Sequence, residues 1–236
     1  MNTTNILRRL HGGLIVSCQA YPGEPMRDAR IMTAIAEAAV LGGACAIRAQ
    51  GLDDLRSIRA SLDVPLIGLV KVGTDGVFIT PTVADCIDVA QTGAEIVALD
   101  GTDRDRPDGS SLQDCIDAIH THGALAMADC GSTANAAASL AAGVDLIGTT
   151  LSGHTGDRPR TEGPDFDFLA ELVKLTATPV LAEGRIRTPH DAARCLELGA
   201  FAVVVGTAIT HPTSITRQFA SALTAEAARD EGVSRR

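Results

Sequence analysis

The chain has 236 residues, of which 29 are Asp or Glu and 20 are Lys or Arg, so its formal net charge is −9 at pH 7. This length, with 45% hydrophobic residues, is typical of one domain with a large core, which excludes a disordered chain and a disulfide-stapled small protein. An acidic surface repels a phosphate backbone, and no long run of Lys and Arg occurs, so we expect no binding to nucleic acid.

The cysteines and the N-terminal residues bear on compartment and on metal binding. No Cys-x-x-Cys pair and no Cys/His ligand spacing occurs, which argues against a zinc site and a disulfide framework. Arg8 and Arg9 are not followed by an apolar run, and nowhere do 18 apolar residues follow one another, so we expect no signal peptide and no membrane span. The sequence therefore predicts a cytoplasmic protein with reduced, mostly buried thiols, at Cys18, Cys45, Cys86, Cys115, Cys130 and Cys195.

Along the chain, the first predicted element is a short helix, because Ile6, Leu7 and Leu10 recur at helical spacing. After it, one pattern recurs: an Ala-rich helical stretch ends in Gly and a small residue, as at Gly93-Ala94 or Gly199-Ala200, and a short aliphatic run begins at once. Glycine just past a helix end is a C-cap, and an apolar run of this kind indicates a strand buried on both faces. The pattern predicts parallel strands that alternate with helices.

Counting these runs gives a closed barrel of eight units. The predicted strands are 14–19, 45–49, 66–71, 96–101, 125–130, 146–150, 180–184 and 202–206. The predicted helices are 28–41, 53–61, 82–91, 111–122, 133–142, 165–175, 189–198 and 214–228, and several begin at an Asp, Ser or Thr cap. We therefore predict an α/β fold, a (β/α)8 TIM barrel of one domain spanning 1–236, with a core at about 12–228, the N-terminal helix at the bottom of the barrel and a frayed tail at 229–236.

Polar residues stand at the C-terminal ends of the predicted strands, where the active site of a TIM barrel lies. The barrel geometry predicts that the five charged ones converge on a single site, although any one of them could instead form a structural ion pair. In strand order, the residues at these ends are Ser17, Gln19, Arg48, Lys71, Asp100, Asp129, Thr149, Thr150, Glu183, Gly206 and Thr207.

The last two units suggest a phosphate site. A glycine follows each of the last two strands, at Gly184 and Gly206, and glycine allows the backbone to approach a ligand closely. Many barrels bind phosphate with backbone N–H groups of these two loops and with the N-terminus of a short helix. We expect Gly184, Arg185, Gly206 and Thr207 to bind phosphate in this way, although the Arg185 side chain could instead pair with a surface carboxylate.

Several of these segments together resemble a known family. Leu14-Ile-Val-Ser-Cys-Gln19, Ala46-Ile-Arg48-Ala49, Ile67-Gly-Leu-Val-Lys71, Met127-Ala-Asp129, Ile147-Gly-Thr-Thr-Leu151, Leu181-Ala-Glu-Gly184 and Val204-Val-Gly206 resemble N-acetylmannosamine-6-phosphate 2-epimerases, which belong to the ribulose-phosphate-binding barrels. The resemblance covers about residues 10 to 220. Two positions depart from the family pattern: His211 stands where Arg is frequent, and Cys130-Gly-Ser follows Asp129 in place of an aliphatic residue.

The resemblance implies an isomerase that interconverts N-acetylmannosamine 6-phosphate and N-acetylglucosamine 6-phosphate in sialic acid breakdown. It implies Lys71 and Glu183 as the acid/base pair and Gln19, Arg48 and Asp129 as substrate contacts. From its place at the end of a strand, we add Thr150 as a candidate substrate contact, although it could be an ordinary strand residue. Inversion at C2 proceeds through an enolate and requires no metal and no organic cofactor, so we expect none. Either Lys71 or Glu183 could remove the C2 proton. We further expect a homodimer, from the resemblance and the Ala-rich helices.

Two other functions remain open at this level. A phosphate-binding barrel could instead use Lys71 in a Schiff-base aldolase or lyase reaction. A sensor could bind the sugar phosphate without turnover.

Overall fold

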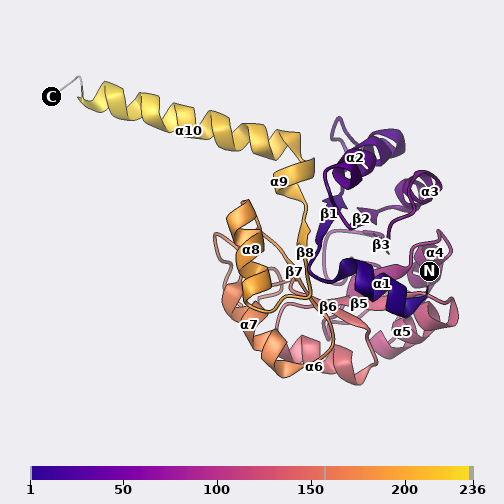
Figure 1. The fold of residues 1–236 in the computed structure, drawn as a ribbon. Helices are drawn as coiled ribbons and strands as arrows, with labels where there is room; N and C mark the ends of the chain where they lie inside the picture. The colour runs from indigo at the N-terminus through magenta and orange to yellow at the C-terminus, as the bar shows by residue number, and fades with distance from the viewer. Residues whose placement is uncertain (1, 157, 234–236) are drawn as a thin grey trace.

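The computed structural model describes residues 2–156 and 158–233 and contains a closed barrel of eight parallel strands. Each strand pairs with the next in chain order, and β8 pairs with β1, which closes the barrel (Figure 1). The TIM-barrel prediction is confirmed, and all eight predicted strands are present. They are β1 (Leu14–Cys18), β2 (Ala46–Gln50), β3 (Leu66–Leu69), β4 (Ile96–Asp100), β5 (Leu125–Asp129), β6 (Leu146–Gly148), β7 (Val180–Glu183) and β8 (Ala202–Val205).

Helices follow the strands and form the outer layer. Three of them begin with a capping box, in which Thr82, Ser111 and Thr188 each exchange hydrogen bonds with an Asp three residues later. These local signals are why the predicted helices occur where the sequence placed them. The helices are α1 (Thr3–Leu10), α2 (Ala29–Leu41), α3 (Leu52–Ser61), α4 (Val83–Ala90), α5 (Leu112–Thr121), α6 (Thr133–Ala141), α7 (Phe166–Leu175), α8 (Pro189–Glu197), α9 (Thr207–Thr210) and α10 (Pro212–Val233).

The apolar core has two layers, one inside the barrel and one between the strands and the helices. Buried side chains from β1, β3, β4 and β7, such as Ile15, Ile67, Ile96 and Leu181, fill the inside. Ile6 and Leu10 of α1 are buried in the same cluster, so this helix covers the end of the barrel at which the strands begin. The predicted place of the N-terminal helix is confirmed, and the opposite end is left for polar groups.

The chain differs from the prediction after β3. The strand ends at Leu69, two residues before the predicted end, and Lys71 forms an antiparallel bridge with Ile79. The N–H of Thr80 donates to the carbonyl of Val70 at 2.8 Å, so the segment folds back on itself. The returning segment lies against β4, because the N–H of Asp100 donates to the Ile79 carbonyl at 3.0 Å and the Thr80 hydroxyl donates to the Ala98 carbonyl at 2.6 Å.

The C-terminal part also differs. The short helix α9 was not predicted, and α10 is longer than the predicted 214–228. Residues 229–233 of the predicted frayed tail belong to α10, and 234–236 lie outside the described residues. In Figure 1, α10 extends away from the barrel after α9.

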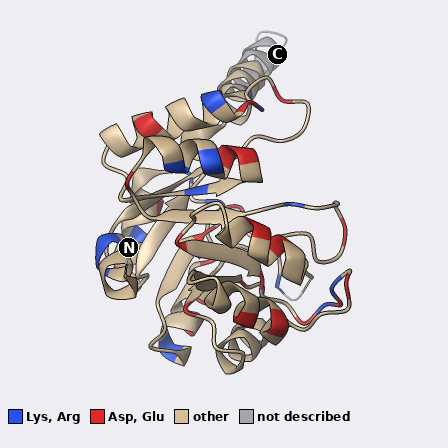
Figure 2. Ribbon diagram, turned by 90° about the vertical axis from the view of Figure 1, so that its right-hand side faces the viewer, with Lys and Arg blue, Asp and Glu red and all other residues tan. Residues whose placement is uncertain are grey.

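The charged residues are spread over the surface elements. In the view of Figure 2, Lys and Arg occur singly or in small groups on helices and loops, interspersed with Asp and Glu. None of the helices within the described residues is long and apolar enough to cross a membrane.

Candidate functional site

Arg48 lies at the centre of the polar end of the barrel. It alternates along β2 with Ala46, whose side chain belongs to the interior cluster, so the Arg48 side chain also points inward. Its Nη2 lies 2.6 Å from Oδ2 of Asp129, and its Nη1 lies 3.1 Å from Oδ1 of Asp129 and 3.1 Å from Oε2 of Glu183. One guanidinium therefore contacts the carboxylates at the ends of both β5 and β7.

The charges of Arg48, Asp129 and Glu183 interact strongly because the cluster is buried. Only 1% of Arg48 and 0% of Asp129 are exposed to solvent. Burial alone would lower the pKa of Arg48, but the charges of Asp129 and Glu183 raise it above its ordinary value, so Arg48 stays protonated. Its Nε atom is buried and, within the described residues, has no hydrogen-bond partner, which leaves one donor for an oxygen of a ligand.

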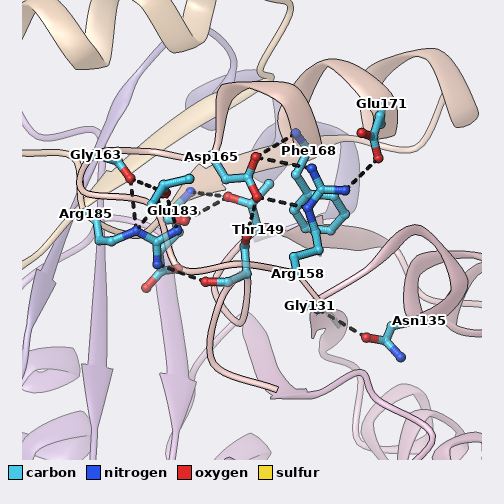
Figure 3. Close-up of polar contacts among 12 residues, drawn as sticks. Gly131, Asn135, Thr149, Arg158, Gly163, Asp165, Phe168, Glu171, Glu183 and Arg185 are labelled. Atoms are coloured by element: carbon cyan, nitrogen blue, oxygen red, sulfur yellow. Dashed lines mark hydrogen bonds and ion pairs between the residues drawn. The ribbon is translucent and has the colours of Figure 1, made fainter. Parts of the chain in front are cut away.

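Thr149 and Thr150, which follow β6, hold Glu183 in place. The Thr149 hydroxyl donates to the Glu183 carbonyl at 2.8 Å and accepts from the Glu183 N–H at 2.9 Å, and both residues appear in Figure 3. The Thr150 hydroxyl lies 2.6 Å from Oδ1 of Asp129 and 3.2 Å from Oε2 of Glu183. The backbone and the carboxylate of Glu183 are thus both fixed from β6.

The surroundings of Glu183 favour its protonated form. Burial raises the pKa of Glu183 to about 7, against the opposing charge of Arg48, and the charge of Asp129 adds to the increase. The Thr150 hydrogen bond and the charge of Lys71 act in the opposite direction. A carboxyl group in this range exchanges a proton readily at neutral pH.

Lys71 reaches the same site from the segment after β3. Its Nζ donates to Oε1 of Gln19 at 2.8 Å, and Nε2 of Gln19 donates to Oγ of Ser17 at 2.9 Å. The ring of Tyr21 lies 5.2 Å from Nζ, a cation–π contact. Burial and the charge of Arg48 lower the pKa of Lys71, while Glu183 and Asp129 oppose that change. Lys71 is therefore a better base than a free lysine.

The two candidate phosphate loops are adjacent, because β7 and β8 pair. Gly184 and Arg185 both have positive φ angles, 109° and 56°, and Gly206 precedes the first turn of α9. In the part of the chain that the structure describes, the N–H groups of Gly184, Arg185, Gly206 and Thr207 donate to no backbone carbonyl. These donors suit an anion.

The structure contradicts one alternative, the surface ion pair of Arg185, and one expectation, the place of Asp100 in the charged cluster. The Arg185 side chain pairs with no surface carboxylate among the described residues; it donates to the carbonyls of Ser152 and Gly163, on the connection between β6 and α7. Asp100 does not join the charged cluster, since its carboxylate binds Thr102 and Arg104 of its own loop. The charges that converge are Arg48, Lys71, Asp129 and Glu183.

The structure adds residues that the sequence did not assign to the site. Tyr21, the single tyrosine, lies over Lys71, and its place two residues after Gln19 was a signal. Gln50 alternates with Arg48 along β2, and its buried Oε1 has no partner within the described residues. Among those residues, no group of three or more His, Cys, Asp or Glu side chains is arranged to hold a metal ion. All six cysteines are free thiols, and five are buried.

Known proteins similar in sequence to this chain belong to one family of epimerases. The family described as "Putative N-acetylmannosamine-6-phosphate epimerase" matches residues 32–225. The chain belongs to this epimerase family. A protein of Cutibacterium acnes, named "Putative N-acetylmannosamine-6-phosphate 2-epimerase", is 51% identical over 224 residues, which cover 94% of this chain and 98% of the relative. A Clostridium perfringens protein of the same name is 44% identical over 90% of this chain and 97% of its own length.

Solved structures agree at two levels. The N-acetylmannosamine-6-phosphate 2-epimerase from Clostridium perfringens matches this epimerase family member with a TM-score of 0.90 and 42% identity, over 94% of this chain and 97% of the other. A thiamine phosphate pyrophosphorylase from Pyrococcus furiosus matches with a TM-score of 0.60 and 19% identity, over 87% of this chain and 91% of the other, which concerns the fold alone.

Proposed function

We propose that this protein interconverts N-acetylmannosamine 6-phosphate and N-acetylglucosamine 6-phosphate by removing and returning the proton at C2. The observation that carries the proposal is that Glu183 contacts Arg48 and that Lys71 is close enough to feel the charges of both, where burial lowers the pKa of the amine and raises that of the carboxyl to about 7. An amine with a lowered pKa and a carboxyl group with a raised pKa give and accept a proton more readily at the pH of the cell than the free groups do.

The reaction requires an open-chain sugar whose C1 aldehyde acidifies the C2 proton. Removal of that proton places negative charge on O1, which a cation or a hydrogen-bond donor must stabilise. The free Nε of Arg48 and the amide of Gln19 are suited to this role. We assign Lys71 as the principal acid/base and Glu183 as its partner, with Asp129 and Thr150 as substrate contacts, of which Thr150 also holds the Glu183 carboxylate.

The phosphate group would be bound by the backbone N–H groups of Gly184, Arg185, Gly206 and Thr207. Their freedom from backbone partners supports this assignment. A dianion bound by several N–H groups supplies binding energy remote from C2, which positions the reacting carbon.

Incubation with N-acetylmannosamine 6-phosphate in deuterated water tests the reaction. We expect deuterium at C2 and the appearance of N-acetylglucosamine 6-phosphate by NMR. Binding of the sugar phosphate with neither deuterium uptake nor product would contradict the proposal and favour a sensor.

A lysine with a lowered pKa is also what a Schiff-base enzyme requires, so that alternative needs its own test. Borohydride reduction in the presence of substrate would attach the sugar to Lys71 only if an imine forms. The chain has two lysines, and the other, Lys174, is exposed on α7, so Lys174→Met is a matched control for the site of attachment. We expect no attachment.

Three finer features belong to the same proposal. The family resemblance supports a role in sialic acid breakdown, and the free thiols with a phosphorylated substrate support a cytoplasmic location. The apolar side chains of Phe219 and Leu223 on α10 are 71% and 74% exposed, which supports a homodimer in which this helix packs against a second copy.

A further inference from the structure

Arg185 has an unusual backbone for its residue type. Its φ angle is 56°, in the left-handed region, and it follows Gly184 and Glu183 at the end of β7. A side chain with a Cβ atom occupies this region at a cost in strain, and it persists where the surrounding contacts fix it.

The guanidinium group supplies those contacts. Its Nη1 donates to the Ser152 carbonyl at 2.8 Å, its Nε to the Gly163 carbonyl at 2.9 Å and its Nη2 to the Thr161 hydroxyl at 3.0 Å. Figure 3 shows Arg185 directed toward Gly163. All three nitrogens of the group therefore bind the connection between β6 and α7, and the side chain is directed at protein oxygens.

The connection that Arg185 binds begins with Thr149 and Thr150, the residues that fix Glu183. At its other end, Asp165 accepts from the Ser152 hydroxyl at 2.6 Å and caps α7 through the N–H of Phe168. The connection is thus held at Asp165 and at Arg185, and its first residues are held against β7.

The connection also contacts itself closely. A Cβ atom built at Gly153, where φ is 73°, would lie 2.7 Å from Cα of Arg160. Position 153 therefore accepts only glycine without a change in the path of the chain.

We propose that the Arg185 side chain is a positioning residue: it holds the β6–α7 connection against the end of β7, and so keeps Thr149 and Thr150 in place on Glu183. Its share of phosphate binding is then limited to its backbone N–H. This inference rests on the proposed function, because it assigns Arg185 an effect on proton transfer instead of on substrate affinity.

Arg185→Ala separates these two roles, with Arg187→Ala as the matched control. Arg187 lies two residues further on, carries the same charge and is exposed. For Arg185→Ala we expect kcat to fall about 10- to 100-fold, because small displacements of a catalytic group have effects of this size. We expect the KM of the sugar phosphate and the Ki of inorganic phosphate to stay within about threefold of wild type.

The pH profile supplies a readout that a loss of general stability would not change. The Thr150 hydrogen bond lowers the pKa of Glu183, as the larger effect of the Arg48 charge also does, while burial and the charge of Asp129 raise it. If Thr150 moves in Arg185→Ala, the acid limb of kcat shifts to higher pH, and Thr150→Val gives a shift in the same direction. Arg187→Ala leaves the limb in place.

A change in KM and in the Ki of inorganic phosphate, without a change in kcat, would overturn the proposal. If Arg185→Ala raises KM and the Ki of inorganic phosphate together while kcat is kept, the side chain binds phosphate. Should Arg185→Ala fail to fold, Gly153→Ala distorts the same connection with Arg185 intact, and the same fall in kcat at constant phosphate Ki is expected.

Amide hydrogen exchange tests the contact independently of turnover. Peptides from residues 149–156 and 158–165 should exchange faster in Arg185→Ala than in wild type and in Arg187→Ala. If these peptides exchange at the wild-type rate in Arg185→Ala, the proposal is overturned even if the kcat of the variant is reduced. Failure of the proposed function is distinguishable, since it is seen as wild-type protein that incorporates no deuterium at C2.

Discussion

The guanidinium of Arg48 and the carboxylate of Asp129 form a bidentate ion pair at the polar end of the barrel, with nitrogen–oxygen distances of 3.1 and 2.6 Å. Neither side chain is accessible to solvent beyond 2%. A buried pair of this kind contributes little net stability compared with an apolar pair, but loss of one partner leaves the other charge buried and uncompensated. Substitutions in this cluster therefore combine effects on stability and on chemistry.

Asp129→Ala should reduce the free energy of unfolding by about 3–5 kcal/mol, because Arg48 would keep its charge in a buried site. Urea denaturation at neutral pH measures the change. Asp103→Ala removes the same charge from an exposed loop and should leave the free energy of unfolding within about 0.5 kcal/mol. Equal stability of the two variants would show that Glu183 alone compensates the buried charge of Arg48.

Lys71→Met should abolish turnover while the fold is kept, since a general acid/base is worth about 100-fold or more in rate. Methionine is unbranched and close to lysine in length, and it removes the charge together with the cation–π contact to Tyr21. Lys174→Met, in the other lysine of the chain, should retain wild-type kcat. A Lys71→Met variant with more than about a tenth of wild-type kcat would remove Lys71 from the acid/base role.

Because the pKa of Glu183 is about 7 in the folded protein, the free energy of unfolding depends on pH. The native carboxyl binds its proton more tightly than the unfolded one, whose pKa is about 4.5, so its contribution is complete below the unfolded pKa and is lost as pH rises through about 7. Glu183→Gln does not titrate. Its free energy of unfolding relative to wild type should therefore increase between about pH 5 and pH 8, measured by urea denaturation. A difference that is independent of pH would contradict the raised pKa.

The sequence predicted the barrel and the convergence of Arg48, Lys71, Asp129 and Glu183 because both follow from local periodicity and from the geometry of parallel strands. It did not predict the pairing of Lys71 with Ile79, which depends on a contact outside the periodic elements. The path of the Arg185 side chain depends likewise on Ser152 and Gly163, distant in the sequence.

Asp100 was misassigned for a local reason. Its position at a strand end is equivalent to that of Asp129, with which it is in register, but Arg104 and Thr102 of its own loop bind its carboxylate. The short helix α9 was missed because four residues carry no periodic signal.

Thr207→Pro tests the phosphate site by removing one N–H group. Thr207 is the first residue of α9, a position at which proline fits a helix, so the change removes a donor, and Gly206, whose ψ is −90°, must adapt to the proline that follows it. We expect the KM of the sugar phosphate and the Ki of inorganic phosphate to rise together by about 10- to 100-fold, with kcat kept, since a hydrogen bond to a charged group is worth about 1.5–3 kcal/mol. Thr207→Ala retains the N–H and should match wild type. If both variants behave like wild type, Thr207 does not bind the phosphate.

The exposed helix α10 leads to a prediction about assembly. It contacts α9 and then extends away from the barrel, with Phe219 and Leu223 four residues apart on one face and largely exposed (Figure 1). Apolar side chains so placed are stabilised by burial against another surface, and a second copy of this chain also carries an exposed Ile31 on α2. Light scattering at micromolar concentration should give twice the monomer mass of 24.4 kDa. Phe219→Asp combined with Leu223→Asp should give the monomer mass, because burying two carboxylates is costly. Gln218→Asp, at an exposed neighbouring position, should remain dimeric. A wild-type protein with the monomer mass would contradict the dimer, and a double variant that keeps the dimer mass would exclude this face of α10 as the interface.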